Sequence, residues 1–431
     1  MKKDINIGLL GLGTVGSGVY RILTRHRDDF RLKVGADLNI KAILERDISK
    51  ADAVGADRSL VTTDAPSIIG DPDIDIVVEV LGGVEPARTF ILQAIESGKH
   101  IVTANKELLA DHGRDIFEAA DAKGVDVYFE ASVGGGIPII HPLKECLASN
   151  KIIKVMGIVN GTTNYILTRM AEEGCLFKEA LKEAQARGYA ERDPSADIEG
   201  RDAAAKIAIL ASIAFNSRVT SPDVYMEGIS GVTPEDIMYA GEMGYVIKLV
   251  ALAKEEKDGL DVRVHPTMIP RDHPLASVRG VYNAIFVEGD AVGEVMFFGP
   301  GAGSMPAASA VVGDVLDVAR NLQYGRSGKV GCTCFETKKI KTIGEISSGY
   351  YLLMNVVDKP GVLAKIAKAF GDNDVSLASV IQKGPRGANA ELVFITHLTR
   401  EKNLRAALKV IEGLDVVNRV CNVIRVENSG D

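Results

Sequence analysis

A polar stretch near the middle of the chain carries the residue types of acid–base chemistry. From Gly188 to Lys206 it reads G-Y-A-E-R-D-P-S-A-D-I-E-G-R-D-A-A-A-K. Its first half is rich in acids and cannot form a helix interior, because Pro194 removes a backbone donor and Gly200 loosens the chain. A helix is predicted from Arg201, and the apolar run I-A-I-L-A-S-I-A-F after Lys206 indicates that this helix is buried.

Asp202 and Lys206 lie four residues apart and share one face of that helix. One interpretation is a surface ion pair, which stabilises a protein by only ~0.3–0.5 kcal/mol. The other is chemical, because an ammonium among apolar neighbours is costly to desolvate and its pKa falls toward the range of a general acid or base. The apolar flanks favour the chemical interpretation, in which Lys206 transfers a proton and Asp202 holds the amine in place.

The N-terminal residues predict a nucleotide-binding turn. Residues 5–10 predict a short buried strand, residues 14–25 have helical spacing, and Gly11-x-Gly13-x-x-Gly16 lies between them. The glycines let backbone amides approach a pyrophosphate at the helix N-terminus. A plain tight turn is the alternative, but the order strand, turn, helix favours dinucleotide binding.

The next strand is predicted at 40–44, after a charged connection at 24–37. The residues at its end do not decide whether the coenzyme is NAD or NADP. Glu45 could bond ribose hydroxyls, which favours NAD. Arg46 and Lys50 could hold a 2′-phosphate, which favours NADP. Each of these side chains could equally belong to a solvated turn.

Further β-α units follow, and their strands end in polar residues. The strand at 75–81 is nearly all apolar, which is typical of parallel strands covered on both faces. After the strand at 99–102 comes T-A-N-K, from Thr103 to Lys106. Because the carboxyl ends of parallel strands face the ligand crevice, Lys106 is predicted to contact cofactor or substrate, unless it is an exposed residue at a helix start. The other predicted elements are helices at 85–98 and 108–123 and a strand at 125–130.

Two glycine-rich loops bound a mixed α+β region. The first, E-A-S-V-G-G-G-I-P from Glu130, could approach a ligand, wrap a small cation through free carbonyls, or act as a hinge. The second runs from Gly299 to Gly303 and opens a helix at 306–321 that is expected to return to the first domain. Between them lie predicted strands at 151–159, 261–269, 281–288 and 292–298, the polar turn N-G-T-T-N at 160–164, and a helix beginning near Tyr165.

The C-terminal part predicts a linker and a self-contained tail. Residues 324–348 are polar and contain Gly, Lys and Ser, as linkers do. The tail, 349–427, has the order β-α-β-β-α-β of a ferredoxin-like sandwich and no obvious nucleophile or base. Its elements are expected at 350–357, 361–371, 374–382, 389–398, 400–413 and 415–426, with turns D-K-P-G at 358–361 and G-P-R-G at 384–387.

Composition narrows the classes of partner. The chain has 431 residues, 46% hydrophobic and 25% charged, as in an ordinary globular protein, and a net charge of −8 disfavours nucleic acid and anionic membranes. Asp4 interrupts the only stretch that resembles a signal peptide, and no apolar run reaches 18 residues, so no membrane span is expected. None of the five cysteines forms a C-x-x-C, and Cys332-Thr-Cys334 is too tight for the usual zinc knuckle. A cytoplasmic location follows as the expectation.

Taken together and in order, these motifs resemble the homoserine dehydrogenase family. The resemblance rests on G-L-G-T-V-G, T-A-N-K, E-A-S-V-G-G-G-I-P, N-G-T-T-N and the stretch from Gly188, and it covers residues 1 to about 320. The tail resembles an ACT domain, with D-K-P-G at 358–361 as its signature turn. The family implies reversible hydride transfer between L-homoserine and L-aspartate 4-semialdehyde with NAD or NADP, in the biosynthesis of threonine, methionine and isoleucine.

The resemblance also implies residue roles. Lys206 would be the acid/base on the substrate oxygen and Lys106 would lie beside it, with Glu191 and Asp202 holding the amino acid and Asp197 in support. The implied cofactor residues are Gly11, Leu12, Gly13, Thr14, Val15, Gly16, Arg46, Thr103, Lys106, Gly188 and Gly303. Glu130 and the carbonyls of Val133, Gly135 and Ile137 would bind a structural sodium ion. Glu45 departs from the family, in which that position is commonly apolar, so the choice between NAD and NADP stays open.

The expected architecture is a Rossmann-type α/β domain, a mixed α+β catalytic and dimerisation domain, and a ferredoxin-like ACT domain, in a homodimer or homotetramer. The expected bounds are 1–130 with the return helix 304–323, then 131–303, a linker at 324–348, and 349–431. Two other functions stay open: a semialdehyde dehydrogenase with a thiol nucleophile, for which the cysteines have unremarkable contexts, and a non-catalytic nucleotide sensor. The tail would bind threonine for feedback inhibition, or serve dimerisation alone.

Overall fold

The computed structural model describes residues 2–326, 331–386 and 388–427, and the chain divides into two compact units. The first unit comprises Met1–Val155, Ala205–Asp223 and Asn283–Lys338, and the second comprises Met156–Ala204, Val224–Tyr282 and Lys339–Asp431. Residues 327–330 of the predicted linker and Gly387 of the predicted turn lie outside the described residues. Over the described parts, no helix combines the length and apolar character needed to cross a bilayer.

The first unit contains a six-stranded parallel sheet in the order β3-β2-β1-β4-β5-β6. This confirms the Rossmann-type sheet expected from the sequence. The strand order reverses between β1 and β4, and in such sheets ligands bind at that point, beyond the carboxyl ends of the strands. The strands are β1 Asp4–Leu10, β2 Asp37–Leu44, β3 Val61–Thr62, β4 Ile76–Glu79, β5 His100–Thr103 and β6 Val127–Tyr128.

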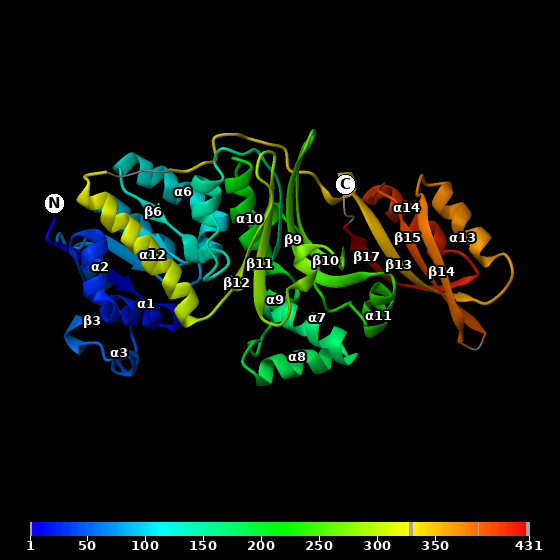
Figure 1. The fold of residues 1–431 in the computed structure, drawn as a ribbon, viewed down its shortest axis with the longest axis horizontal. Coiled ribbons are helices and arrows are strands. Elements are labelled where there is room, and N and C mark those ends of the chain that lie inside the picture. The colour runs from blue at the N-terminus through cyan, green and yellow to red at the C-terminus, as the bar shows by residue number, and fades with distance from the viewer. Residues whose placement is uncertain (1, 327–330, 387, 428–431) are drawn as a thin grey trace. The chain divides into compact units, whose positions relative to one another are not determined.

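Two helices far apart in the sequence share the core on one face of this sheet. Helix α1 (Thr14–Arg25) lies beside α12 (Ser304–Gln323), seen in Figure 1 as the blue and yellow helices. Val19 of α1 and Val315 of α12 are fully buried in one apolar cluster. A Cβ on Gly18 would lie only 2.6 Å from the Ser304 carbonyl oxygen, so a glycine permits this close approach.

The charged connection expected at 24–37 contains a helix that the sequence did not predict, α2 (Arg27–Val34). Phe30 and Val34 lie four residues apart and bury themselves in the same core, which is enough to hold a short helix whose other residues are charged. Other α-helices and strands of this unit are α3 Ile48–Val54, α4 Ala65–Ile69, α5 Ala87–Glu96, α6 Lys106–Lys123 and β12 Gly293–Pro300; β11 is Tyr282–Gly289.

In the second unit, six strands follow the order β9-β10-β17-β13-β15-β14. The last four belong to the tail, and with helices α13 and α14 they confirm the predicted β-α-β-β-α-β order. The tail is not self-contained, however, because β17 pairs in parallel with β10 at Thr267↔Arg425 and Met268↔Val426. The bounds are β9 Tyr245–Glu256, β10 Gly259–Pro270, β13 Ser347–Val357, α13 Val362–Gly371, β14 Leu377–Arg386, β15 Asn389–Thr396, α14 Glu401–Glu412 and β17 Val417–Val426; β8 Tyr225–Met226 pairs β10 and β16 Thr399–Arg400 pairs β13.

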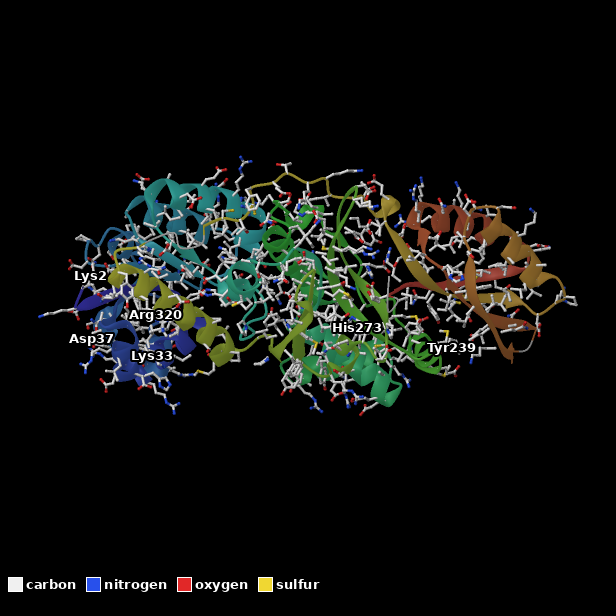
Figure 2. All side chains as sticks on the ribbon, turned by 45° about the horizontal axis from the view of Figure 1, so that its top comes forward. Lys2, Lys33, Asp37, Tyr239, His273 and Arg320 are labelled. Atoms are coloured by element: carbon white, nitrogen blue, oxygen red, sulfur yellow. The ribbon has the colours of Figure 1, made fainter. Side chains whose placement is uncertain are left out.

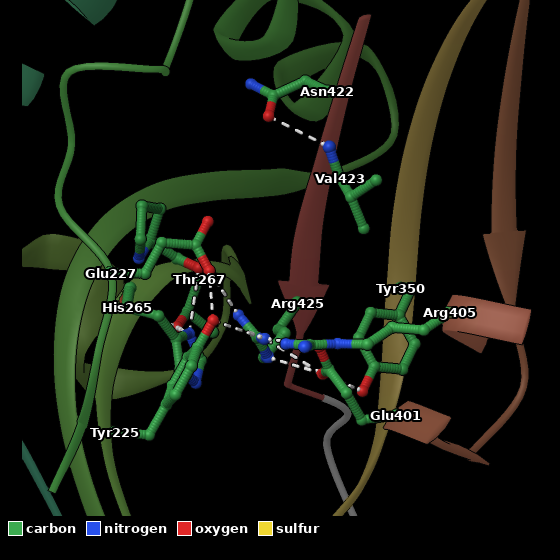
Figure 3. Close-up of polar contacts among 11 residues, drawn as sticks. Tyr225, Glu227, His265, Thr267, Tyr350, Glu401, Arg405, Asn422, Val423 and Arg425 are labelled. Atoms are coloured by element: carbon green, nitrogen blue, oxygen red, sulfur yellow. Dashed lines mark hydrogen bonds and ion pairs between the residues drawn. The ribbon is translucent and has the colours of Figure 1, made fainter. Parts of the chain in front are cut away.

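Buried polar contacts join the tail to the rest of this unit. Tyr239 of α11 (Pro234–Glu242), labelled in Figure 2, donates its hydroxyl to Glu391 Oε2 at 2.6 Å. Figure 3 shows Arg425 between Glu227, accepting from Nη1 at 2.8 Å, and Glu401, accepting from Nη2 at 2.9 Å. The Arg425 and Glu401 side chains are 5% and 6% exposed, so this ion pair is shielded from water.

Two differences from the sequence expectations concern helices of this region. Helix α7 (Gly161–Glu173) begins at Gly161 rather than near Tyr165, because the Asn160 side chain caps it by accepting from the Thr163 amide at 2.9 Å. Pro194 precedes a four-residue helix, α9 (Ser195–Ile198), within the stretch expected to be irregular. Helix α10 (Arg201–Ala214) begins where predicted, and the chain passes from the second unit to the first within it. The other elements are β7 Ile152–Ile158 and α8 Phe177–Ala186.

Candidate active site

The glycine turn after β1 has the geometry that its spacing predicts. Gly11 has φ +105°, and a Cβ on Gly16 would lie 2.0 Å from the Gly11 carbonyl oxygen, so neither position accepts a side chain without strain. Gly13 caps α1 and has open space where a Cβ would stand. Thr14 and Val15 begin the helix, so the α1 N-terminus faces the turn with unshielded amides.

A pocket of about 350 Å³ opens at this turn, lined by Gly11, Gly13, Glu45, Arg46 and Lys50 among others. The Glu45 carboxylate folds over the turn: Oε2 accepts from the Leu12 amide and from Lys50 Nζ, both at 3.1 Å. Its Oε1 accepts from the Arg46 and Asp47 amides at 2.9 and 3.1 Å. Burial works to raise the pKa of Glu45, but the Asp47 amide, Lys50 and the other donors outweigh it and lower that pKa. The carboxylate is therefore ionised and partly neutralised by Lys50.

The glycine-rich loop from Gly299 to Gly303 leads into α12 and contacts the glycine turn after β1. Gly303, with φ +123°, precedes α12, and the Ser304 hydroxyl donates to the Thr14 carbonyl at 2.6 Å. Gly303 and Thr14, both expected at the cofactor, are thus brought together.

The T-A-N-K segment is held by a buried carboxylate that the sequence did not single out. Glu79, at the end of β4, accepts from the Thr103 hydroxyl at 2.7 Å, and the Thr103 oxygen accepts from the Asn105 amide at 3.0 Å. Asn105 caps α6, whose first residue is Lys106. Burial raises the pKa of Glu79. The Thr103 side chain is consequently turned into this network, so a role at the cofactor would fall to its backbone.

Two of the predicted substrate-binding acids meet at one amide in the second unit. Asn160 Nδ2 donates to Asp197 Oδ1 at 2.6 Å and to Asp202 Oδ2 at 2.8 Å. Asn160 is buried, so it fixes the separation of the two carboxylates from the interior side. Glu191 is exposed, and nearby Gly188, with φ +75°, ends the turn after α8.

Lys206 lies one turn after Asp202 on α10, but it is half-buried rather than buried. Its helical neighbours Ala205 and Ile207 are buried, so the apolar flanks were predicted correctly. Lys206 and Lys106 belong to the first unit, whereas Glu191, Asp197, Asp202 and Gly188 belong to the second.

The Glu130 carboxylate is occupied by backbone amides, so a cation in the loop after it would have to be held by backbone carbonyl oxygens. Glu130 Oε1 accepts from the Ile139 and Ile140 amides at 2.5 and 2.8 Å and Oε2 from the His141 amide at 2.8 Å, so the side chain is committed. Val133 and Ile137 are buried, and Gly135 has φ +57° with its Cβ position 2.5 Å from the Gly301 carbonyl oxygen. The buried Ser132 hydroxyl has no hydrogen-bond partner among the described residues, which leaves one uncompensated oxygen in this loop.

Sequence reasoning also missed Lys248, in the middle of β9. Its ammonium donates to Asn164 Oδ1 at 2.9 Å and to the Val278 carbonyl at 2.6 Å. Burial lowers the pKa of Lys248 to about 8. A single lysine inside the apolar run Y-V-I-K-L-V-A-L was the available signal, and its partner closes the N-G-T-T-N motif.

The parallel sheet, its reversal point and the glycine turn define a dinucleotide-binding protein, and the lysines and acids add acid–base groups, as in NAD(P)-dependent oxidoreductases. Comparison with known proteins gives the family. The homoserine dehydrogenase model matches residues 138–316, the model of the homoserine dehydrogenase NAD-binding domain matches 11–130, and the ACT domain model matches 350–416. The chain belongs to the homoserine dehydrogenase family, and it is an oxidoreductase that acts on a CH–OH group with a nicotinamide cofactor.

Relatives resemble the chain over its whole length. Homoserine dehydrogenase of Synechocystis is 48% identical over 98% of this chain and 99% of its own, and that of Bacillus subtilis is 44% identical over 99% of both. A crystal structure of a homoserine dehydrogenase from Thiobacillus denitrificans superposes with a TM-score of 0.94 at 44% identity over 99% of both chains. A hyperthermophilic archaeal homoserine dehydrogenase in complex with NADPH has a TM-score of 0.63 at 29% identity, covering 73% of this chain and 97% of its own.

Proposed function

We propose that the enzyme interconverts L-homoserine and L-aspartate 4-semialdehyde, with the amino acid held by Asp202 and Glu191 and supported by Asp197. The observation that carries this proposal is the pair of hydrogen bonds from Asn160 to Asp197 and Asp202. Two carboxylates brought to one neutral amide can both accept hydrogen bonds from the substrate ammonium. The lysines supply positive charge for the substrate carboxylate and for the reacting oxygen.

Lys206 is the acid/base and Lys106 lies beside it in the proposed mechanism. The nicotinamide, when bound, supplies the acceptor or donor of hydride. In homoserine oxidation, neutral Lys206 takes the hydroxyl proton as the C–H hydride leaves, and the substrate becomes an aldehyde. In the reverse direction, the Lys206 ammonium hydrogen-bonds to the aldehyde oxygen and then gives it a proton. Such proton transfer contributes ~10²–10⁴-fold to the rate.

The coenzyme, NAD or NADP, would lie on the glycine turn, with Gly11, Leu12, Gly13, Thr14, Val15 and Gly16 around the pyrophosphate. Arg46, the backbone of Thr103, Lys106, Gly188 and Gly303 complete the proposed contacts. The 350 Å³ pocket beside Glu45 and Arg46 supports the adenosine end of this placement. A structural sodium ion is proposed at the carbonyl oxygens of Glu130, Val133, Gly135 and Ile137, supported by the unpaired Ser132 oxygen.

We propose that threonine binds the ACT domain and inhibits the enzyme. A pocket of about 200 Å³ lies at the D-K-P-G turn, lined by Asp358, Lys359 and Gly361 from the turn and by Gln382 from β14. Its charged groups suit the carboxylate and ammonium of a free amino acid. A threonine titration that lowers activity and raises the melting temperature supports regulation, whereas no effect on either leaves the tail as a dimerisation module.

The proposed domains keep the bounds 1–130 with 304–323, 131–303, the linker 324–348 and 349–431, in a cytoplasmic homodimer or homotetramer. The family matches at 11–130, 138–316 and 350–416 support the division. Five free cysteines support a reducing compartment.

The direct test is reduction of NAD⁺ or NADP⁺ by the purified enzyme, followed by absorbance at about 340 nm. We expect homoserine to support reduction of the coenzyme, and serine and threonine not to support it. A protein that binds the coenzyme but shows no homoserine-dependent reduction with either form would instead be a nucleotide sensor. Loss of activity on thiol blocking would point to the thiol-dependent class of semialdehyde dehydrogenase.

A further inference from the structure

Two cysteines that the proposed reaction does not use share a small cavity in the first unit. Cys332 and Cys334 flank Thr333, a spacing too tight for the usual zinc knuckle. Both are half-buried, and they border a cavity of about 30 Å³, which is large enough to admit water. Helices α6 and α10 form its apolar wall, and Lys144 and Arg218 bring positive charge to it.

The two thiols are held close to each other and to a cation. Arg218 Nη2 donates to Cys332 Sγ at 3.6 Å, and the thiol groups of Cys332 and Cys334 are hydrogen-bonded together. The hydrogen bond from Cys334, followed by Arg218 and Lys144, lowers the pKa of Cys332, while the same hydrogen bond raises the pKa of Cys334. One sulfur is therefore prepared as a thiolate, which is the nucleophilic form, and the other keeps its proton.

Backbone contacts fix this segment against the end of α10. Cys334 Sγ also lies 3.7 Å from the Ser212 carbonyl oxygen. The Glu336 amide donates to the Asn216 carbonyl at 2.8 Å, and the Lys338 amide donates to the Ser217 hydroxyl at 2.9 Å. Two cysteines with only a packing role would be expected among apolar neighbours. Here the Arg218 guanidinium lies within hydrogen-bonding distance of one of the two sulfurs.

We propose that Cys332 and Cys334 form a modification site that reacts with low-molecular-weight disulfides and closes to an intramolecular disulfide. The Cys332 thiolate attacks one sulfur of the small disulfide, a new S–S bond forms, and one small thiolate leaves. Cys334 then loses its proton and attacks the Cys332 sulfur, which forms the protein disulfide and releases the second small thiolate. The two protein sulfurs are oxidised to a disulfide and the small disulfide is reduced to two thiol-level sulfurs; the Cys334 proton passes to one leaving thiolate, and the other takes a proton from solvent, which received the Cys332 proton when its thiolate formed.

The other cysteines provide internal comparisons. Cys175 has its pKa raised by burial, which disfavours its thiolate. Cys146 is exposed and can react as an ordinary surface thiol. Selective reaction at the C-T-C pair, rather than at these two, is what the site predicts.

The test treats the full-length enzyme with glutathione disulfide at neutral pH and follows intact mass and non-reduced peptide maps. The wild type should lose two hydrogens in a link between Cys332 and Cys334 without keeping glutathione, and Cys334→Ser should keep one glutathione on Cys332. Cys175→Ser is the matched control and should behave as the wild type. Glutathione held stably on both cysteines, or faster reaction at Cys146 than at Cys332, would overturn the proposal.

Replacing Arg218 tests the electrostatic part. Without the guanidinium the pKa of Cys332 rises, so less of it is thiolate, but each thiolate is more nucleophilic. Arg218→Gln should therefore slow the first exchange ~3-fold at neutral pH. Arg218→Lys keeps a positive charge and should retain most of the rate. Melting curves of both variants check that the fold persists. Equal rates for Arg218→Gln and the wild type, with both folded, would show that the cation does not activate Cys332.

Discussion

The most informative substitution at the coenzyme pocket is Glu45→Gln. The Glu45 carboxylate lies over the glycine turn, where it accepts from the Leu12 amide at 3.1 Å and pairs with Lys50 at 3.1 Å. A glutamine keeps the side-chain length but has one oxygen, so it can accept from the Leu12 amide or from the Arg46 and Asp47 amides, but not from both sets. What changes is the charge at the place where an adenosine ribose is expected.

The size of the effect follows from the strength of a charged hydrogen bond. A carboxylate that accepts from a ribose hydroxyl contributes ~1.5–3 kcal/mol, and a neutral amide oxygen contributes ~0.5–1.5 kcal/mol. The difference of ~1–1.5 kcal/mol corresponds to about tenfold in kcat/KM for NAD⁺. For NADP⁺ the substitution removes a negative charge near the 2′-phosphate and frees Lys50, so kcat/KM should stay equal or rise.

The assay measures kcat/KM for NAD⁺ and NADP⁺ at saturating homoserine in the wild type, in Glu45→Gln, and in Arg46→Gln as the opposed control. The ratio of NADP⁺ to NAD⁺ specificity should rise about tenfold in the first variant and fall in the second. An unchanged ratio in Glu45→Gln, with an intact melting temperature, would refute the placement of the ribose beside this carboxylate.

Three other predictions concern buried groups. Arg425→Met leaves Glu401 buried without its main partner and should cost ~3–5 kcal/mol, seen as a lower melting temperature, whereas a loss below ~1 kcal/mol would contradict the shielded pair. In the native state the pKa of Lys248 is about 8, which is below its value in the unfolded chain. At a pH between the two values the unfolded chain binds more protons, so the free energy of unfolding increases as pH rises. Between about pH 8 and 10 the wild type should therefore gain ~1.4 kcal/mol per pH unit over Lys248→Met, and a constant difference would be the contrary result. Asn160→Ala should raise KM for homoserine ~10-fold with little change in KM for the coenzyme, and the reverse pattern would remove Asn160 from the substrate side.

The features that the sequence predicted well are local. The glycine turn at Gly11 and Gly16 was predicted from the sequence because the glycines lie directly between a strand pattern and a helix pattern. The start of the helix at Arg201 was predicted because Pro194 precedes it and a run of alanines follows it. The β-α-β-β-α-β order of the tail was visible for the same reason, since each element carries its own periodicity.

The features that it missed depend on distant partners. Glu79 looks like any strand-end acid until the fold brings Thr103 to it, and Lys248 gains its role only through Asn164 and Val278. The parallel pairing of β17 with β10 is equally non-local, so the tail looked self-contained. Asn160 was read as part of a turn because a cap and a turn residue share the same chemistry.

The proton-transfer role of Lys206 is the central claim, and Lys206→Ala tests it most directly. Coenzyme affinity by titration and homoserine-dependent turnover should be measured on the same preparation, with Lys178→Ala, an exposed lysine of α8, as the matched control. The account predicts unchanged coenzyme binding, unchanged turnover in Lys178→Ala, and turnover lowered at least ~10²-fold in Lys206→Ala. Near-wild-type turnover by a folded, coenzyme-binding Lys206→Ala enzyme would contradict it.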